Sequence, residues 1–377
     1  MPAQPGVTAM TQPAYDIPLM RPRLPDAAAL LPYLQEIDRN RWYANFGPLE
    51  TRLEQRLAGM LGLAGGQVTG LVNGTVALAL ALSEAAGGRR GYCLMPSFTF
   101  VATAHAAVSA GLTPWFLDID PNSWTLSPEI ARAALRKVDG PVVAVLPVAA
   151  FGAPMDAAAW DEFAEETGLP VVMDAAAGVD GARIGQAPVM ISLHATKPLA
   201  AGEGAIVAGR DAGRIQGVRA RSNFGFQGRR SAELSGTNGK MNEYSAAVGL
   251  ASLDAWSETR ESLLRVARLY RETLSDVPDL AFAPGFDGRH AVSTCNVRLA
   301  RPVADEAISR LAAQGIEARQ WWEKGCHLQP AFNDCPRTPL PETEHLGARV
   351  IGLPFYRGMD VSAVERVRAA LLPVLRG

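Results

Sequence analysis

The sequence lacks the features that mark nucleic-acid-binding and membrane proteins. Its 36 Lys and Arg residues nearly balance 38 Asp and Glu residues, giving a formal net charge of -2, and no basic block occurs. The chain therefore has little electrostatic attraction for phosphate backbones or anionic lipid surfaces. No apolar run is long enough to span a membrane without Gly, Pro or charge, and the opening residues do not have the pattern of a secretory signal. We expect a cytoplasmic protein that binds neither nucleic acid nor membrane.

Cysteine is also scarce. Cys93, Cys295, Cys326 and Cys335 form no CxxC pair, which argues against a disulfide framework or a zinc knuckle. Cys326 precedes His327, but no further metal-ligating residues follow at a suitable spacing. The sequence therefore predicts reduced thiols and no metal site.

The 377 residues are 48% hydrophobic and 20% charged, as in ordinary globular proteins of about two domains. Before residue 210, short apolar runs such as "VVAVLPVAA" alternate with helix-length segments such as "DAAAWDEFAEETG". This alternation predicts an α/β protein with a mostly parallel sheet that helices cover on both faces. We expect a flexible tail over residues 1–16, a large domain over 17–257, and a smaller α+β domain over 258–377.

Three predicted strands end in residues that could bind a ligand. "LVNGTVALAL" runs from a strand through Gly74 and Thr75 into a helix, whose first N–H groups could hold a phosphate or simply receive an N-cap. Phe100 follows a second strand, where core packing is the alternative. Asp174 ends a third strand, "LPVVMD", where it either caps a helix or is buried with a cationic or hydrogen-bonded partner.

A fourth strand end, "ISLHATK", contains Ser192 and Lys197. The sequence has only four lysines, and Lys197 alone follows a strand so directly. Lys197 is therefore a candidate for chemistry, and the alternative is that it is an ordinary solvated lysine on the surface. Taken together, the strand ends offer a phosphate cradle, a flat aromatic ring, an acid for a ring nitrogen and a lysine for an aldehyde. Pyridoxal 5'-phosphate requires this set.

The same residues carry a family resemblance over nearly the whole chain. In the order "IPLMRPRLP", "NGTVALALAL", "PSFTFVATAHA", "DAAAG", "SLHATKPLAAGEG", "GTNGKMNEYSAAVGL" and "GLPF", the sequence resembles the DegT/StrS-type sugar-nucleotide aminotransferases. These are fold-type-I pyridoxal-phosphate enzymes with an aspartate-aminotransferase-like fold. The resemblance implies that Lys197 forms the Schiff base, that Asp174 pairs with the pyridine nitrogen and that Phe100 stacks on the ring. It also implies that the phosphate is bound by Gly74, Thr75 and Ser192, and that Asn238 reaches the phosphate of the neighbouring subunit. It therefore implies a homodimer with shared active sites.

The chain departs from the family pattern at a few positions. Ala177 stands where many members have Gln or His, and Lys240 stands where Arg is frequent. The retained Lys197 argues against the branch that removes a sugar hydroxyl, because a histidine replaces the lysine there.

The stretch "IEARQWWEKGCHLQPAFNDCP" resembles the branch that acts on nucleotide-linked 4-keto-6-deoxyhexoses, such as the enzymes that make 4-amino-4,6-dideoxyglucose. Trp321, Trp322 and His327 are candidate substrate residues, although the indoles could equally pack in the core. The implied reaction moves an amine from an amino-acid donor, glutamate by resemblance, to the C4 keto carbon of a nucleotide sugar. The alternatives are another keto-sugar, a keto-cyclitol, or a non-catalytic regulator that retains the fold.

Overall fold

The large sheet contains most of the predicted strands. The computed structural model describes residues 15–376, so all but the last two residues of the expected tail lie outside the described part. The strands are β1 (Val68–Leu71), β2 (Tyr92–Pro96), β3 (Thr113–Leu117), β4 (Val142–Val145), β5 (Met173–Asp174), β6 (Val189–Ser192) and β7 (Ala205–Ala208). Bridges from Val145 to Val171 and from Val148 to Asp174 join the groups β3-β2-β4 and β5-β6-β7-β1.

The sheet is mostly parallel, as the sequence predicts. Strand β2 runs parallel to β3 and β4, and β5 runs parallel to β6. Strand β7 is antiparallel to both of its neighbours, β6 and β1. Every residue of β6 and β7 is buried, which is typical of strands covered on both faces.

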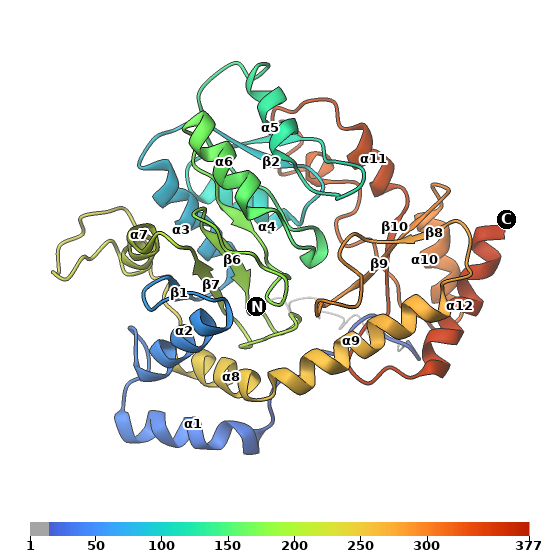
Figure 1. The fold of residues 1–377 in the computed structure, drawn as a ribbon, viewed down its shortest axis with the longest axis horizontal. Coiled ribbons are helices and arrows are strands. Elements are labelled where there is room, and N and C mark those ends of the chain that lie inside the picture. Colours follow the sequence, from blue (N-terminus) through green and yellow to red (C-terminus); the bar gives the residue numbers. More distant parts are fainter. Residues whose placement is uncertain (1–14, 377) are drawn as a thin grey trace, which may run out of the picture.

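Helices cover both faces of this sheet (Figure 1). Because side chains alternate along a strand, Val189 and Ile191 join one buried cluster while Met190 joins another. The first cluster includes side chains of α2 (Pro48–Met60), α5 (Pro128–Leu135), α6 (Ala157–Thr167) and α8 (Glu243–Asp254). The second includes side chains of α3 (Gly74–Ala86), α4 (Val101–Ser109) and α7 (Ala212–Ser222). Helix α1 (Ala27–Asn40) packs outside, against α8.

The C-terminal part has a core of its own. Strands β8 (Leu280–Phe282), β9 (Cys295–Leu299) and β10 (Val350–Leu353) form an antiparallel sheet. Helices α9 (Trp256–Thr273), α10 (Ala304–Ala312) and α12 (Val361–Arg376) pack in this core. Helix α11 (Pro341–Gly347) and the short 3-10 turn η2 (Cys326–Leu328) precede β10, whereas the 3-10 turn η1 (Ala150–Gly152) follows β4 of the large sheet. Ile17 is buried in this C-terminal core and forms a backbone bridge with Ile316. The division at residues 257 and 258 stays a prediction.

Helix α9 follows α8 with a break at Ala255 and leads into the C-terminal part (Figure 1). No helix among the described residues is both long enough and apolar enough to cross a membrane.

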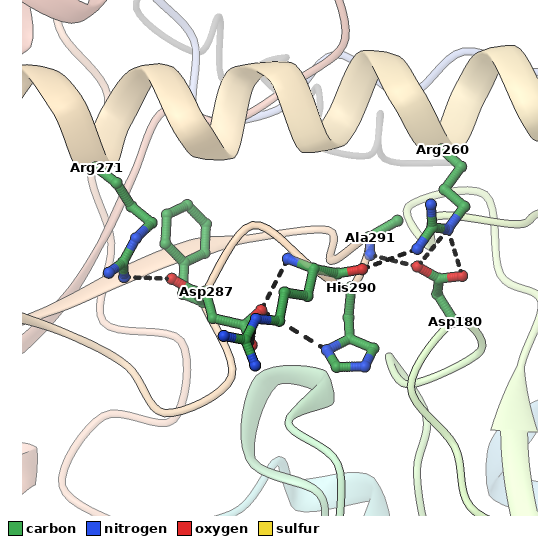
Figure 2. A network of polar contacts seen from close by, with 8 residues as sticks. Asp180, Arg260, Arg271, Asp287, His290 and Ala291 are labelled. Carbon is green, nitrogen blue, oxygen red and sulfur yellow. Dashed lines mark hydrogen bonds and ion pairs between the residues drawn. The ribbon is translucent and has the colours of Figure 1, made fainter.

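A polar network centred on Asp180 ties the two parts together (Figure 2). Arg260, on α9, donates through Nε to both carboxylate oxygens of Asp180 at 2.8 Å, and the Ala291 N–H donates to the same carboxylate at 2.8 Å. The Arg260 Nη2 group also donates to the carbonyl of Arg289 at 2.8 Å. Asp180 lies six residues after Asp174, so the network attaches the loop that follows β5 to α9 and to the segment before β9.

We predict that Asp180→Ala lowers the free energy of unfolding by about 2–3 kcal/mol, because it leaves the Arg260 and Ala291 donors without their shared acceptor. Denaturant unfolding of the full chain measures the loss. The matched control is Glu261→Ala on the same helix, whose partner Arg268 is half-exposed and whose removal should cost at most about 1 kcal/mol. Equal losses in the two variants would contradict a special role for the network.

Candidate active site

Lys197 lies in the loop between β6 and β7. Backbone bonds close this loop, from Leu193 N–H to the Gly204 carbonyl at 2.9 Å and from Ala201 N–H to the Leu193 carbonyl at 2.7 Å. Burial lowers the pKa of the Lys197 amine, and the Asp174 carboxylate acts in the opposite direction. The neutral, nucleophilic form of the Lys197 amine is therefore more populated than it would be in a lysine on the surface.

Asp174 is a buried carboxylate at the end of β5, with 5% of its surface exposed. The Thr103 hydroxyl donates to its Oδ2 at 2.9 Å, and the Ala176 N–H donates to its Oδ1 at 3.1 Å. Burial raises the pKa of Asp174, while these two hydrogen bonds and Lys197 lower it. Because β5 and β6 are parallel neighbours, their ends bring Asp174 and Ser192 to the same edge of the sheet.

The start of α3 forms a cradle beside β6. Asn73 is the N-cap residue and accepts from Val76 N–H at 2.9 Å. A Cβ atom added to Gly74 would lie 3.4 Å from the Met190 sulfur and 3.6 Å from the Ser192 Cβ. The helix start therefore lies directly against Ser192. Gly74 and Thr75 occupy the first helical turn, whose N–H groups have no partner within the helix.

Phe100 directly precedes α4 and is 57% exposed, so it is not packed in the core. The same helix carries Thr103, which sequence reasoning missed. No local signal points to Thr103, because its contact with Asp174 arises from how α4 packs in the fold.

The candidate substrate residues pack against the segment after β2. The His327 ring pairs through Nδ1 with the Ser97 hydroxyl at 2.7 Å, and only 2% of His327 is exposed. Trp322 stacks on Phe151 with ring centroids 3.9 Å apart, and Trp321 borders the same apolar cluster. Within the described residues, no hydrogen bond, ion pair or aromatic contact joins Trp321, Trp322 or His327 to Lys197 or Asp174. Their role toward a substrate stays a prediction.

Asn238 is exposed and forms a backbone bridge with Asn223. The next residue, Gly239, accepts from the Val72 N–H at 2.8 Å, which attaches this loop to the chain just before α3. Lys240 follows, and its ammonium lies 4.8 Å from the centre of the Phe224 ring.

A cavity of about 250 Å³ borders Lys197, and we call it the Lys197 cavity. Its walls come from the N-terminal segment around Arg21, the Lys197 loop, the start of α9, Ser293, and the segment that contains Tyr356 and Arg357. Sequence reasoning did not find it. The local signal is three arginines, two in "LMRPRLP" and one in "PFYRG", and these two segments lie far apart along the chain.

These residues fit pyridoxal 5'-phosphate. A buried carboxylate with two neutral donors would pair favourably with a protonated ring nitrogen, and a helix start beside a serine hydroxyl suits a phosphate. A lysine with a lowered pKa suits covalent attachment of an aldehyde. Within residues 15–376, no group of three His, Cys, Asp or Glu side chains is arranged to hold a metal ion.

The sequence is similar to known aminotransferases over nearly its whole length. The family described as DegT/DnrJ/EryC1/StrS aminotransferases matches residues 26–372. Protein Rv3402c of Mycobacterium tuberculosis is 36% identical over 94% of this chain and 89% of that protein. The dTDP-4-amino-4,6-dideoxy-D-glucose transaminase of Shigella dysenteriae is 32% identical over 92% of this chain and 96% of that protein.

Solved structures agree with this similarity. The structure of DesI in the presence of its TDP-sugar product is 35% identical, with a TM-score of 0.85 over 96% of this chain and 94% of that one. The fold is therefore the predicted fold-type-I arrangement. The chain belongs to the DegT/DnrJ/EryC1/StrS aminotransferase family and is a transaminase that depends on pyridoxal 5'-phosphate.

Proposed function

We propose that this enzyme transfers an amine from glutamate to the C4 keto carbon of a nucleotide-linked 6-deoxy sugar, acting as a cytoplasmic homodimer. The observation that carries the proposal is the meeting of Lys197, Asp174 and the start of α3 at one edge of the sheet. The sugar class is supported by the Shigella transaminase and by DesI, at 32% and 35% identity. The choice of C4 over C3 and the choice of donor are expectations from the sequence.

Each of the site residues has a role in this proposal. Lys197 would hold the cofactor aldehyde and, once released, carry a proton to and from the substrate carbon. Asp174 would keep the ring nitrogen protonated, and Thr103 orients the carboxylate through its hydrogen bond. The first turn of α3 and Ser192 would bind the phosphate. The cofactor, when bound, supplies the electron sink for the carbanion.

A substrate panel tests the proposal. The purified enzyme with cofactor and glutamate is offered a nucleotide-linked 4-keto-6-deoxy sugar, a 3-keto nucleotide sugar and a keto-cyclitol, and amine formation is followed by mass spectrometry. We expect the 4-keto sugar to be converted fastest. Lys197→Ala should abolish conversion in a folded protein, since acid–base catalysis alone contributes about 10²–10⁴-fold. Faster conversion of the cyclitol, or activity of the variant like that of the wild type, would contradict the proposal.

We predict that Asp174→Asn retains bound cofactor, seen by its visible absorbance, but loses most amine transfer. A neutral amide cannot keep the ring nitrogen protonated. Asp156→Asn is the matched control, because Asp156 only caps α6. Steady-state rates of the Asp174 variant within about threefold of wild type, roughly 0.7 kcal/mol of barrier, would show the assigned role to be wrong.

The dimer proposal rests on Asn238, which would reach the phosphate held by the neighbouring subunit. A ligand that only the dimer binds must stabilise that dimer by mass action. Added pyridoxal phosphate should therefore shift the monomer–dimer equilibrium toward dimer, and Asn238→Ala should weaken that shift. Analytical ultracentrifugation measures both, with Asn122→Ala in an exposed turn as the control. A dissociation constant that does not change with cofactor would rule out a shared site.

A further inference from the structure

The Lys197 cavity contains a guanidinium group with unused hydrogen-bonding capacity. Arg357 lines the cavity, and its side chain is 19% exposed. Its Nε atom is buried and has no hydrogen-bond partner among the described residues. On the other side of the group, Nη2 lies 3.4 Å from Glu258, whose side chain is 81% exposed. A buried donor without a partner is unfavourable, and an acceptor entering the cavity would relieve that cost.

The charges around the cavity favour an anion. Arg21, Arg23 and Arg357 line it together with two carboxylates, Asp26 and Glu258. Asp26 already accepts from the Ala29 N–H at 3.0 Å as the N-cap of α1, and Glu258 points largely into solvent. Positive charge is thus in excess at the cavity wall.

The wall that carries Arg357 is held in place. The Arg21 guanidinium stacks on the ring of Tyr356, 4.8 Å from its centre, and Tyr356 is the residue before Arg357. The Asp180 network restrains two other parts of the cavity lining (Figure 2). It binds Arg260, two residues after Glu258, and Ala291, two residues before Ser293.

We propose that Arg357 binds a carboxylate of the amino-acid donor and so places the donor's amino group next to Lys197. This rests on the proposed transamination. A guanidinium presents a planar pair of donors that matches a carboxylate, and the cavity reaches the Lys197 loop. The cavity, of about 250 Å³, lies below the size range typical of drug-sized ligand pockets, and an amino acid is a small ligand. Arg357 thereby selects the amine donor, separately from the residues that recognise the sugar.

Two measurements on the enzyme with cofactor separate donor binding from sugar binding. The first follows the loss of the cofactor's visible absorbance as glutamate is added without any sugar. The second measures calorimetrically the binding of glutarate, a dicarboxylate that has no amine to transfer. We expect Arg357→Gln to weaken both by about tenfold or more, while the KM for the keto-sugar changes less than twofold. Arg357→Lys should give an intermediate loss, since it keeps the charge without the fork.

Arg310→Gln is the matched control, because Arg310 pairs with Glu306 on the exposed face of α10 and lies outside the cavity. Glu258→Gln keeps Arg357 intact and removes its exposed partner. We expect it to tighten glutarate binding by about threefold, which decides the matter if the Arg357 variants do not fold. Unchanged glutarate affinity in Arg357→Gln, or in Glu258→Gln where the former is unfolded, would overturn the proposal. If Arg357→Gln instead raises the KM for the keto-sugar and leaves the reaction with glutamate unchanged, Arg357 would bind the diphosphate of the nucleotide sugar.

The outcomes also distinguish this inference from the proposed acceptor. If wild-type enzyme reacts with glutamate but converts no keto-sugar, the acceptor assignment fails and the donor site stands. If the panel succeeds while Arg357→Gln binds glutarate normally, only the donor site fails.

Discussion

The burial of one carboxylate is the constraint on which the active site depends. Asp174 sits at the end of a covered strand with two neutral hydrogen-bond donors, and burial raises its pKa. A carboxylate in that position gains most from a nearby positive charge. Lys197 provides part of it and lowers the pKa of Asp174, while burial lowers the pKa of Lys197 itself. In the proposed function, a cofactor that brings its own protonated nitrogen would pair with Asp174, and Lys197 would act as the nucleophile.

The sequence was sufficient for the parts of the site that depend on strand ends. Parallel strands covered on both faces must be apolar throughout, so a polar residue at the end of an apolar run marks the edge where ligands bind. The structure has Asp174 and Ser192 at the ends of β5 and β6, and Lys197 in the loop that follows β6, while their roles toward a ligand stay predictions. It also gave the start of α3, because Asn73 caps a helix that directly follows a strand.

Sequence patterns could not reveal contacts between distant segments. Thr103 reaches Asp174 only because α4 packs over the end of β5, and no local pattern states that packing. The Lys197 cavity needs Arg21, Glu258 and Arg357 to converge, although more than 300 positions separate the first from the last. Trp322 is a further case, since the sequence left open whether the indole packs in the core or contacts a substrate. The structure shows the ring stacked on Phe151 at the border of an apolar cluster, and its role toward a substrate stays a prediction.

The placement of the cavity has a consequence for how the two halves of the chain work together. Ile17 is buried in the C-terminal core, and the chain then runs past Arg21 into the cavity wall before α1 packs on α8. Arg357 and Ser293 come from the C-terminal core, whereas Lys197 comes from the large sheet. Any rotation of one core against the other would therefore change the distance between Lys197 and Arg357. The Asp180 network resists that rotation, so it stabilises the fold and the geometry of the proposed donor site through the same hydrogen bonds.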